Sequence, residues 1–280
     1  MKALREGAAT ALERAHRFVE VHGDEISRLR MDGLLQVRPT QEVVQAVAAR
    51  QRADGSFAPL DASSLGAFGF ETAPGGDVAL LGSLDALALL SDLGGLHGRC
   101  VERLVDFVSG AQRDDGSWGS REDQTAEQRL VLSGMLAGVL GKTAVVRESV
   151  LERAGRFVGE HWSPLRVQGG RWVDLAWLAH FFTNVAHESA DEALQWCGRE
   201  LERGFRTRRF SALACARVLL YCKVVTLPAF RVGASELVES LVREQAPDGS
   251  FGVPTGTSDS ARVAPGVDAM QALIVLCASL

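Results

Sequence analysis

The chain has 280 residues, of which 46% are hydrophobic and 23% charged, and its net charge is −5. This is the balance of an ordinary globular protein of one large or two small domains, and the absence of a Lys/Arg block argues against a nucleic-acid partner. The cysteines are scattered and odd in number, which predicts free thiols in a reducing compartment: Cys100, Cys197, Cys215, Cys222 and Cys277.

The N-terminal stretch is the first predicted helix, and it does not resemble a secretory signal because Arg5, Glu6 and Glu13 interrupt any apolar segment. No run of 18 apolar residues occurs, so the sequence predicts no membrane span, and we expect a cytoplasmic protein. Within this helix, LERAHRFVEVH at 12–22 shares eight of eleven residues with LERAGRFVGEH at 151–161, which indicates an internal repeat.

A short signature, Gln-x-x-Asp-Gly-Ser-aromatic, occurs three times along the chain: QRADGSF at 51–57, QRDDGSW at 112–118 and QAPDGSF at 245–251. Apolar residues precede each Gln at positions −4, −7 and −8, the spacing of one helix face. Asp-Gly favours a tight turn in which Gly takes a positive φ, and Gln can bind backbone groups at a helix end. Each signature therefore predicts an amphipathic helix that ends in a turn, with structural duties for its Gln, Asp, Gly and aromatic residue.

More apolar segments with small residues and little charge lie between these amphipathic helices. They have the composition of helices buried on most sides, and strand patterns are nearly absent. The alternation of outer and inner helices predicts an all-α chain, a single domain of about five to six helical hairpins. The predicted inner helices are 77–93, 125–141, 172–186, 210–224 and 267–280.

The distances between signatures predict where the repeats lie. The 133 residues from Gln112 to Gln245 are about twice the 61 from Gln51 to Gln112, so degenerate copies are expected between them. VQGGRW at 167–172 and EALQWCGREL at 192–201 are the candidates. The predicted repeats are about 1–60, 61–119, 120–172, 173–205 and 206–280.

The signature resembles the QW-type repeat of the squalene cyclase and protein prenyltransferase superfamily. LVDFVSGAQRDDGSWG at 104–119 is close to the ideal form of that repeat, and the copies at 43–59 and 237–254 carry Phe in place of Trp. The likeness covers the whole chain and implies an α/α toroid, a ring whose inner helices line a cavity. It also implies a terpene cyclase- or prenyltransferase-like enzyme of biosynthesis that binds an apolar, isoprenoid- or polyene-like substrate without a cofactor.

The chain departs from the catalytic motifs of these families. Class II terpene cyclases use an Asp-x-Asp-Asp acid, and the nearest stretches here, GSLD at 82–85 and REDQTA at 121–126, keep one Asp each. The Asp-x-Cys zinc motif of the prenyltransferases is missing, and core packing explains Cys215 and Cys222, so no metal is predicted. Aromatic residues make up only 6% of the chain, few for a cavity that stabilises carbocations. These departures leave the enzyme class open, with catalysis favoured.

The candidate catalytic residues are polar groups of the predicted inner helices. Asp85 ranks first as the acid, because burying an Asp in an apolar helix is costly without a role. His180 and His187, seven apart on one predicted face, are candidates for a base or a tuning partner, although core packing and helix capping explain both without chemistry. The catalytic candidates are Asp85, Asp77, Asp123, Asp268, His180 and His187, and the substrate-binding candidates are Trp172, Trp177, Asp174 and Phe181.

The alternative function is a non-catalytic toroid that binds a protein or a lipid-like partner. An enzyme predicts a cavity with inward carboxylates or imidazoles, whereas a scaffold predicts a filled ring centre and an exposed apolar patch. The irregular stretch 57–76 is predicted to be either a lid over the ring or a surface connection, and 252–266 is predicted to be a second loop.

Overall fold

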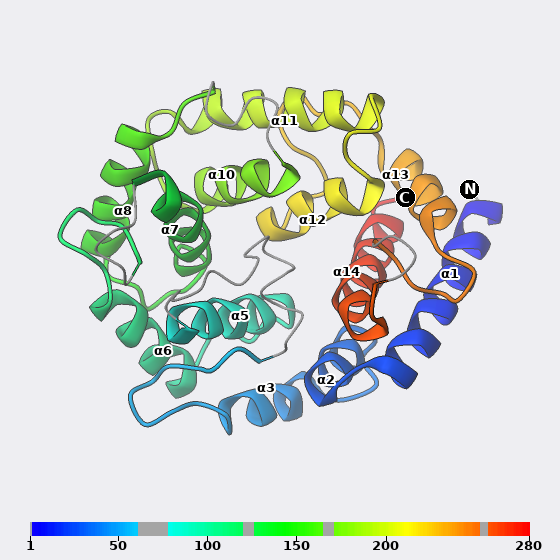
Figure 1. Cartoon of the computed structure of the whole chain (residues 1–280), viewed down its shortest axis with the longest axis horizontal. Helices are drawn as coiled ribbons and strands as arrows, with labels where there is room; N and C mark the ends of the chain where they lie inside the picture. Colours follow the sequence, from blue (N-terminus) through cyan, green and yellow to red (C-terminus); the bar gives the residue numbers. More distant parts are fainter. Residues whose placement is uncertain (1, 61–77, 120–125, 165–170, 253–256) are drawn as a thin grey trace.

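The structure is a computed structural model of the chain, and it describes residues 2–60, 78–119, 126–164, 171–252 and 257–280. Within these ranges it has twelve helices and no strand. The helices form a closed ring with an outer wall and an inner layer (Figure 1). The predicted all-α toroid is therefore confirmed.

The outer and inner helices alternate along the chain. The inner layer holds α5, α7, α10, α12 and α14, and the short helix α2 completes the series between α1 and α3 and packs against α14 (Figure 1). The outer helices are α1 (Lys2–His22), α3 (Thr40–Ala48), α6 (Arg99–Gly110), α8 (Glu148–His161), α11 (Ala190–Arg206) and α13 (Ala234–Glu244). The others are α2 (Glu25–Leu34), α5 (Val78–Asp92), α7 (Ala126–Leu140), α10 (Trp172–Asn184), α12 (Ala212–Cys222) and α14 (Asp259–Ala278).

The structure corrects three details of the sequence interpretation. Helix α14 begins at Asp259, so half of the predicted loop 252–266 is helical: Pro265 and Gly266 resembled helix breakers, but the helix packs against α1, α12 and α13. The stretch EALQWCGREL lies inside α11 and is not a turn. Helix α2 was not predicted, because its ten residues are short and polar.

A degenerate copy lies at the junction of α11 and α12, whereas the other candidate, VQGGRW at 167–172, lies mostly outside the described residues. Gly204 and Phe210 are six residues apart, the spacing of Gln and the aromatic residue in each signature. The Phe210 ring packs so closely on Gly204 that an added Cβ there would lie 2.0 Å from it. Glycine thus stands at this junction where the signatures have Gln, and an aromatic residue again follows six positions later.

Each of the three signatures forms the same joint between repeats. The Gln side chain donates from Nε2 to the Gly carbonyl of its own turn and to a carbonyl of the next outer helix, at 2.8–3.1 Å. The second acceptors are Cys100 in α6 for Gln51, Val150 in α8 for Gln112 and Ala11 in α1 for Gln245. Gln245 therefore joins the last outer helix to the first.

The turn of each joint needs its Asp and its Gly. The Asp Oδ1 accepts hydrogen bonds from the backbone N–H and the hydroxyl of the Ser two residues later. Gly116 has φ +85°, and an added Cβ would lie 2.2 Å from the Arg153 carbonyl oxygen of α8. Gly55 and Gly249 are constrained in the same way, so no side chain fits at these positions.

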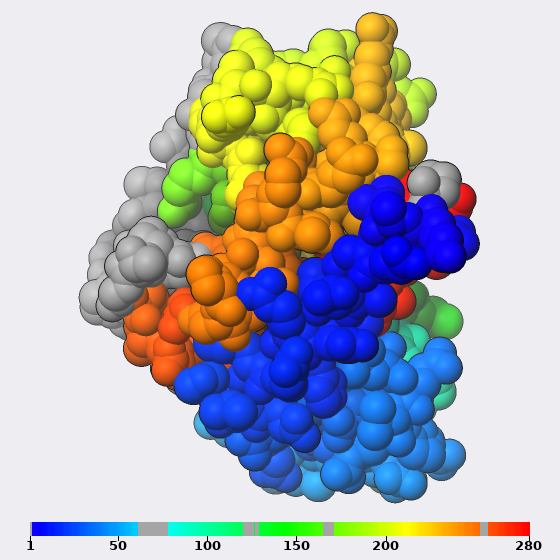
Figure 2. All heavy atoms as spheres, turned by 90° about the vertical axis from the view of Figure 1, so that its right-hand side faces the viewer, coloured from blue at the N-terminus to red at the C-terminus, as the bar shows by residue number. Residues whose placement is uncertain are grey.

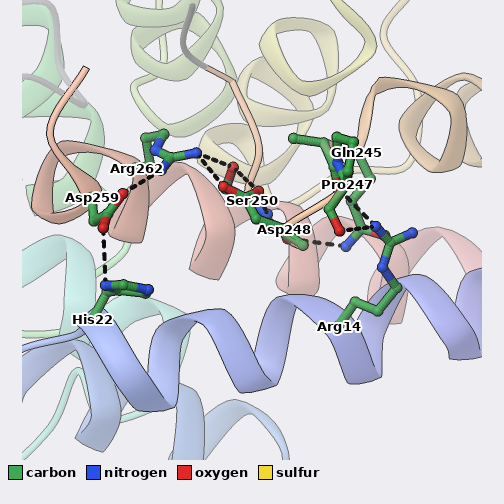
Figure 3. Close-up of polar contacts among 10 residues, drawn as sticks. Arg14, His22, Gln245, Pro247, Asp248, Ser250, Asp259 and Arg262 are labelled. Atoms are coloured by element: carbon green, nitrogen blue, oxygen red, sulfur yellow. Dashed lines mark hydrogen bonds and ion pairs between the residues drawn. The ribbon is translucent and has the colours of Figure 1, made fainter. Parts of the chain in front are cut away.

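Helix α1 closes the ring against the last repeat. It packs along α13 and α14, and Figure 2 shows α1 in blue beside the orange α13. In Figure 3, Arg14 donates to the Ala246 and Pro247 carbonyls at 2.8 Å, and Arg262 bonds Asp248, Ser250 and Asp259. His22 lies 3.3 Å from Asp259, so the middle and the C-terminal end of α1 both hold the seam.

Helix α14 is the one helix in the described ranges that is long and apolar enough to cross a membrane. Two thirds of its apolar window is buried inside the ring, and Asp268 in its middle is ion-paired. These features fit the core helix of a folded ring.

Candidate functional site

A chain of ion pairs crosses the ring interior. Lys223 Nζ lies 3.1 Å from Asp92, Asp92 lies 2.8 Å from Arg30, and Arg30 lies 2.8 Å from Asp268. Asp268 then meets Arg217 Nε at 2.8 Å. The five residues come from α5, α2, α14, α12 and the C-cap of α12, so the chain ties together helices that are far apart in the sequence.

The Lys223–Asp92 pair spans the ring, because α5 and α12 are not neighbours in the inner layer (Figure 1). Lys142, which follows α7, likewise reaches the carbonyl of Tyr221 in α12 at 2.5 Å. Both contacts lie where inner helices end. The C-terminal ends of α5, α7 and α12 are therefore tied across the ring, and the side-chain exposure falls from 38% for Lys223 to 8% for Asp268 farther along the chain of ion pairs.

Burial and charge act against each other at the exposed end of this chain. Burial alone would raise the pKa of Asp92, but Arg30 and Lys223 outweigh it and lower that pKa. Burial, together with the nearby Lys223, lowers the pKa of Lys142 to about 8. A further negative charge nearby would therefore stabilise the charged form of Lys142.

Asp85 lies on the same face of α5 as Asp92. The two residues are seven apart, which is two helical turns and about 10 Å along the axis. Asp92 reaches α2 and the end of α12, so this face of α5 is directed to the ring interior. Asp85 is 4% exposed and lies midway along the helix, farther from the tied helix ends than Asp92.

Asp268 is buried in the middle of α14, not at the start of an inner helix as the sequence suggested. It binds two guanidinium groups, and Arg30 also bonds Gln271 on the next turn. Protonating Asp268 would break both ion pairs. Its position suits a structural or binding role better than that of a proton donor.

His180 and His187 do not share a helix face, because α10 ends at Asn184. His180 is buried, and its Nδ1 donates to the Tyr221 carbonyl at 2.7 Å. Burial and then the nearby Lys142 lower the pKa of His180 well below its usual value, so this imidazole is neutral. His187 accepts from the Ser189 N–H and packs on Gly159 of α8 in the outer wall.

The four predicted substrate-binding residues differ in position. Trp172 is half-buried at the start of α10, and the Arg217 guanidinium lies 5.4 Å from its ring centre. Trp177 packs against Gly134 of α7, another inner helix, and Phe181 packs against Phe182 of α10 itself, so both have packing partners in the inner layer. Asp174 accepts from the Arg171 N–H at the start of the helix. Trp172 is thus the one that contacts the ion-pair chain.

Asp77 and Asp123 lie outside the described residues, as does most of the stretch 57–76. In the part of the chain that the structure describes, no group of three His, Cys, Asp or Glu side chains is arranged to hold a metal ion.

Sequence reasoning missed most of the ion-pair chain, namely Arg30, Asp92, Arg217 and Lys223. Two signals were present. Arg217 is the one charge within the apolar run ALACARVLL, and Asp92 follows Asp85 by two turns on the same helix.

No family model and no curated protein matches the chain. Two solved structures are similar over nearly its full length. A protein from Actinoplanes has a TM-score of 0.60 and 13% identity, over 96% of this chain and 99% of that one. The type II terpene cyclase MstE from Scytonema, in complex with its substrate geranylgeranyl dihydroxybenzoate, has a TM-score of 0.58 and 10% identity, over 100% of both chains. At these identities the likeness is one of fold.

Proposed function

Starting from a terpene cyclase-like toroid, we propose that the chain is an enzyme that binds an isoprenoid- or polyene-like substrate in its ring and starts a cyclisation or isomerisation by protonating it. Asp85 is the acid. The observation that supports this most is its place: a carboxyl group that is 4% exposed, midway along an inner helix, on the face directed to the interior.

The proposed step needs no co-reactant. The Asp85 proton adds to one carbon of an alkene, whose π electrons form the new C–H bond. The adjacent carbon becomes a carbocation, which a second alkene attacks in a cyclisation. Loss of a neighbouring proton restores a double bond and ends either reaction, and that proton returns to Asp85 or to solvent.

The surroundings of Asp85 suit this role. An acid that protonates carbon has to be kept neutral by apolar surroundings, and its neighbours within α5 are mostly leucine and alanine, with Gly82 and Ser83 just before it.

The scaffold alternative has less support in the described ranges. A docking scaffold predicts a contiguous exposed apolar patch, but the large apolar side chains that stay exposed there are single valines on separate segments: Val21, Val37, Val78, Val145 and Val225. A groove of about 770 Å³ does lie outside the ring near Phe205 and Phe210. Within it, Arg206 is paired with Glu236, and Glu244 caps α12, so part of its charge has structural partners, while Arg208 is exposed.

The test is turnover of linear C15 and C20 polyenes in D₂O, including geranylgeranyl diphosphate and geranylgeranyl dihydroxybenzoate. An acid-initiated reaction places one deuterium on carbon, visible by mass spectrometry. We expect Asp85→Asn to lower the rate ~10²–10⁴-fold, the usual contribution of a general acid, at unchanged melting temperature. Asp114→Asn, an exposed signature residue, is the matched control. Full turnover by Asp85→Asn would overturn the assignment.

A further inference from the structure

We propose that the substrate carries an oxyanion head, a carboxylate or a phosphate, and that Arg217 and Arg30 bind it inside the ring. This inference rests on the proposed function and names the part of the substrate that the acid does not touch. It is carried by the guanidinium groups on either side of Asp268.

Both guanidinium groups keep a buried donor that no residue in the described ranges satisfies. Arg217 uses Nε for Asp268, while its Nη2 is buried without a hydrogen-bond partner. Arg30 uses one Nη2 for Asp92, Asp268 and Gln271, while its Nε is likewise buried and unsatisfied. A buried N–H without an acceptor costs free energy, about 1–3 kcal/mol or more for a charged group. Both guanidinium groups contact the Asp268 carboxylate through their other nitrogens, so the two unsatisfied donors are a natural site for ligand oxygens.

The charge balance of the interior favours an anion. Among the described residues, the ion-pair chain and Lys142 contribute four cations, Arg30, Arg217, Lys142 and Lys223, against the carboxylates of Asp92 and Asp268 and against Asp85, which the proposed reaction keeps protonated. Each carboxylate already serves two cations. An oxyanion next to Arg217 and Arg30 would offset this excess in a region where water screens charges poorly.

Arginine is the residue suited to this task. Its planar fork donates two parallel hydrogen bonds to a carboxylate or phosphate, and Asp268 on one side and the Trp172 ring on the other fix its plane. Arg217 is only 9% exposed, so the head would be bound away from bulk water. A neutral alcohol would fill this site without using its charge.

Binding of three compounds that share one C20 polyene tail tests the proposal: geranylgeraniol, geranylgeranoic acid and geranylgeranyl diphosphate. Isothermal titration on the Asp85→Asn protein separates binding from turnover. We expect the acid or the diphosphate to bind ~10–100-fold more tightly than the alcohol, as charge-assisted hydrogen bonds predict. Whichever of the two binds more tightly identifies the carboxylate or the phosphate as the head.

The variants assign this preference to Arg217. Arg217→Gln is expected to bring all three dissociation constants within about threefold of that for the alcohol, and Arg217→Lys, which keeps the ion pair with Asp268, to retain part of the preference. Arg208→Gln, at an exposed arginine outside the ring interior, is the control. Circular-dichroism melting confirms that each variant is folded, and Arg217→Lys carries the test if Arg217→Gln does not fold.

Equal affinity for the alcohol and the acids, or a preference that survives in a folded Arg217→Gln protein, would overturn the head-group site. Turnover of neutral polyenes together with equal affinities would leave the proposed reaction standing and remove only this inference. An Arg217-dependent preference without turnover of any compound would support the binding site and remove the reaction.

Discussion

The joints of the outer wall and the ion-pair chain of the interior use polar residues in opposite ways. The three signature joints repeat one set of hydrogen bonds, with Gln, Asp and Gly in equivalent places. In the interior, Lys223, Asp92, Arg30, Asp268 and Arg217 each occupy a place that no signature repeats. Repetition thus indicates architecture, while polar residues that occur once on buried faces indicate the site.

The largest loss of stability is expected from the joint aromatic. Trp118 is fully buried, and its Nε1 donates to the Val108 carbonyl at 2.7 Å. Trp118→Ala should lower the free energy of unfolding by about 3–5 kcal/mol through the cavity it leaves. Trp118→Phe, the residue of the other two joints, should lose only about 1 kcal/mol for the hydrogen bond. Thermal melting measures both, and equal losses would contradict a packing role.

The next largest effect is expected in the interior. Asp268→Asn removes the charge shared by two buried guanidinium groups and should lower the free energy of unfolding by about 3 kcal/mol. Asp106→Asn on the exposed face of α6 should change it by less than about 0.5 kcal/mol. Urea unfolding checks this pair, and a neutral Asp268→Asn would show that the chain of ion pairs does not hold the ring together.

A smaller loss is expected from the joint glutamine. Gln112→Ala removes hydrogen bonds to the Gly116 and Val150 carbonyls and should lower the free energy of unfolding by about 1–3 kcal/mol. Gln41→Ala, at an exposed position in α3, is the control. Because the joint lies outside the interior, Gln112→Ala should bind ligand with the affinity of the parent chain. A change in affinity would contradict a purely structural role for the joint.

The smallest effect is a pH dependence at the seam. Hydrogen bonds from Ser250, helped by Arg262, lower the pKa of Asp248 to about 2 from 3.8. A lowered carboxyl pKa stabilises the fold above the unfolded value, so this contribution is complete above pH 4 and is lost as the pH falls through 2. Asp248 is largely exposed, so Asp248→Asn should cost less than about 1 kcal/mol at pH 7, and most of that cost should be gone at pH 2. An equal effect at both pH values would contradict the mechanism.

The sequence predicted most of the helices and joints of the ring, because their patterns are local and repeated. Inner helices predicted at 77–93 and 125–141 are observed at Val78–Asp92 and Ala126–Leu140. The joints were predicted from the seven-residue signatures. The Gln of each signature bonds the turn within the signature and a carbonyl of the next outer helix. The predicted start of α14, at 267, was eight residues too late, because Pro265 lies inside this helix.

The interior was predicted only in part, because its contacts join distant residues. Arg30 and Asp92 are 62 positions apart, and Asp92 and Lys223 are 131 apart, so no pattern in the sequence links them. Asp85 was singled out by the cost of burying a charge, which holds at any position, and Asp268 by its place at the start of a predicted inner helix. That cost identifies a buried carboxyl but not its partners, which depend on how the ring closes.

The most direct test of the division between wall and interior compares Asp85→Asn with Gln112→Ala in one experiment. Melting temperature and turnover of the best polyene substrate are measured at a temperature where both variants are folded. We predict that Asp85→Asn keeps its melting temperature and loses turnover at least ~100-fold, while Gln112→Ala melts earlier and keeps its turnover. Full turnover by Asp85→Asn, or loss of turnover by folded Gln112→Ala, would contradict the account.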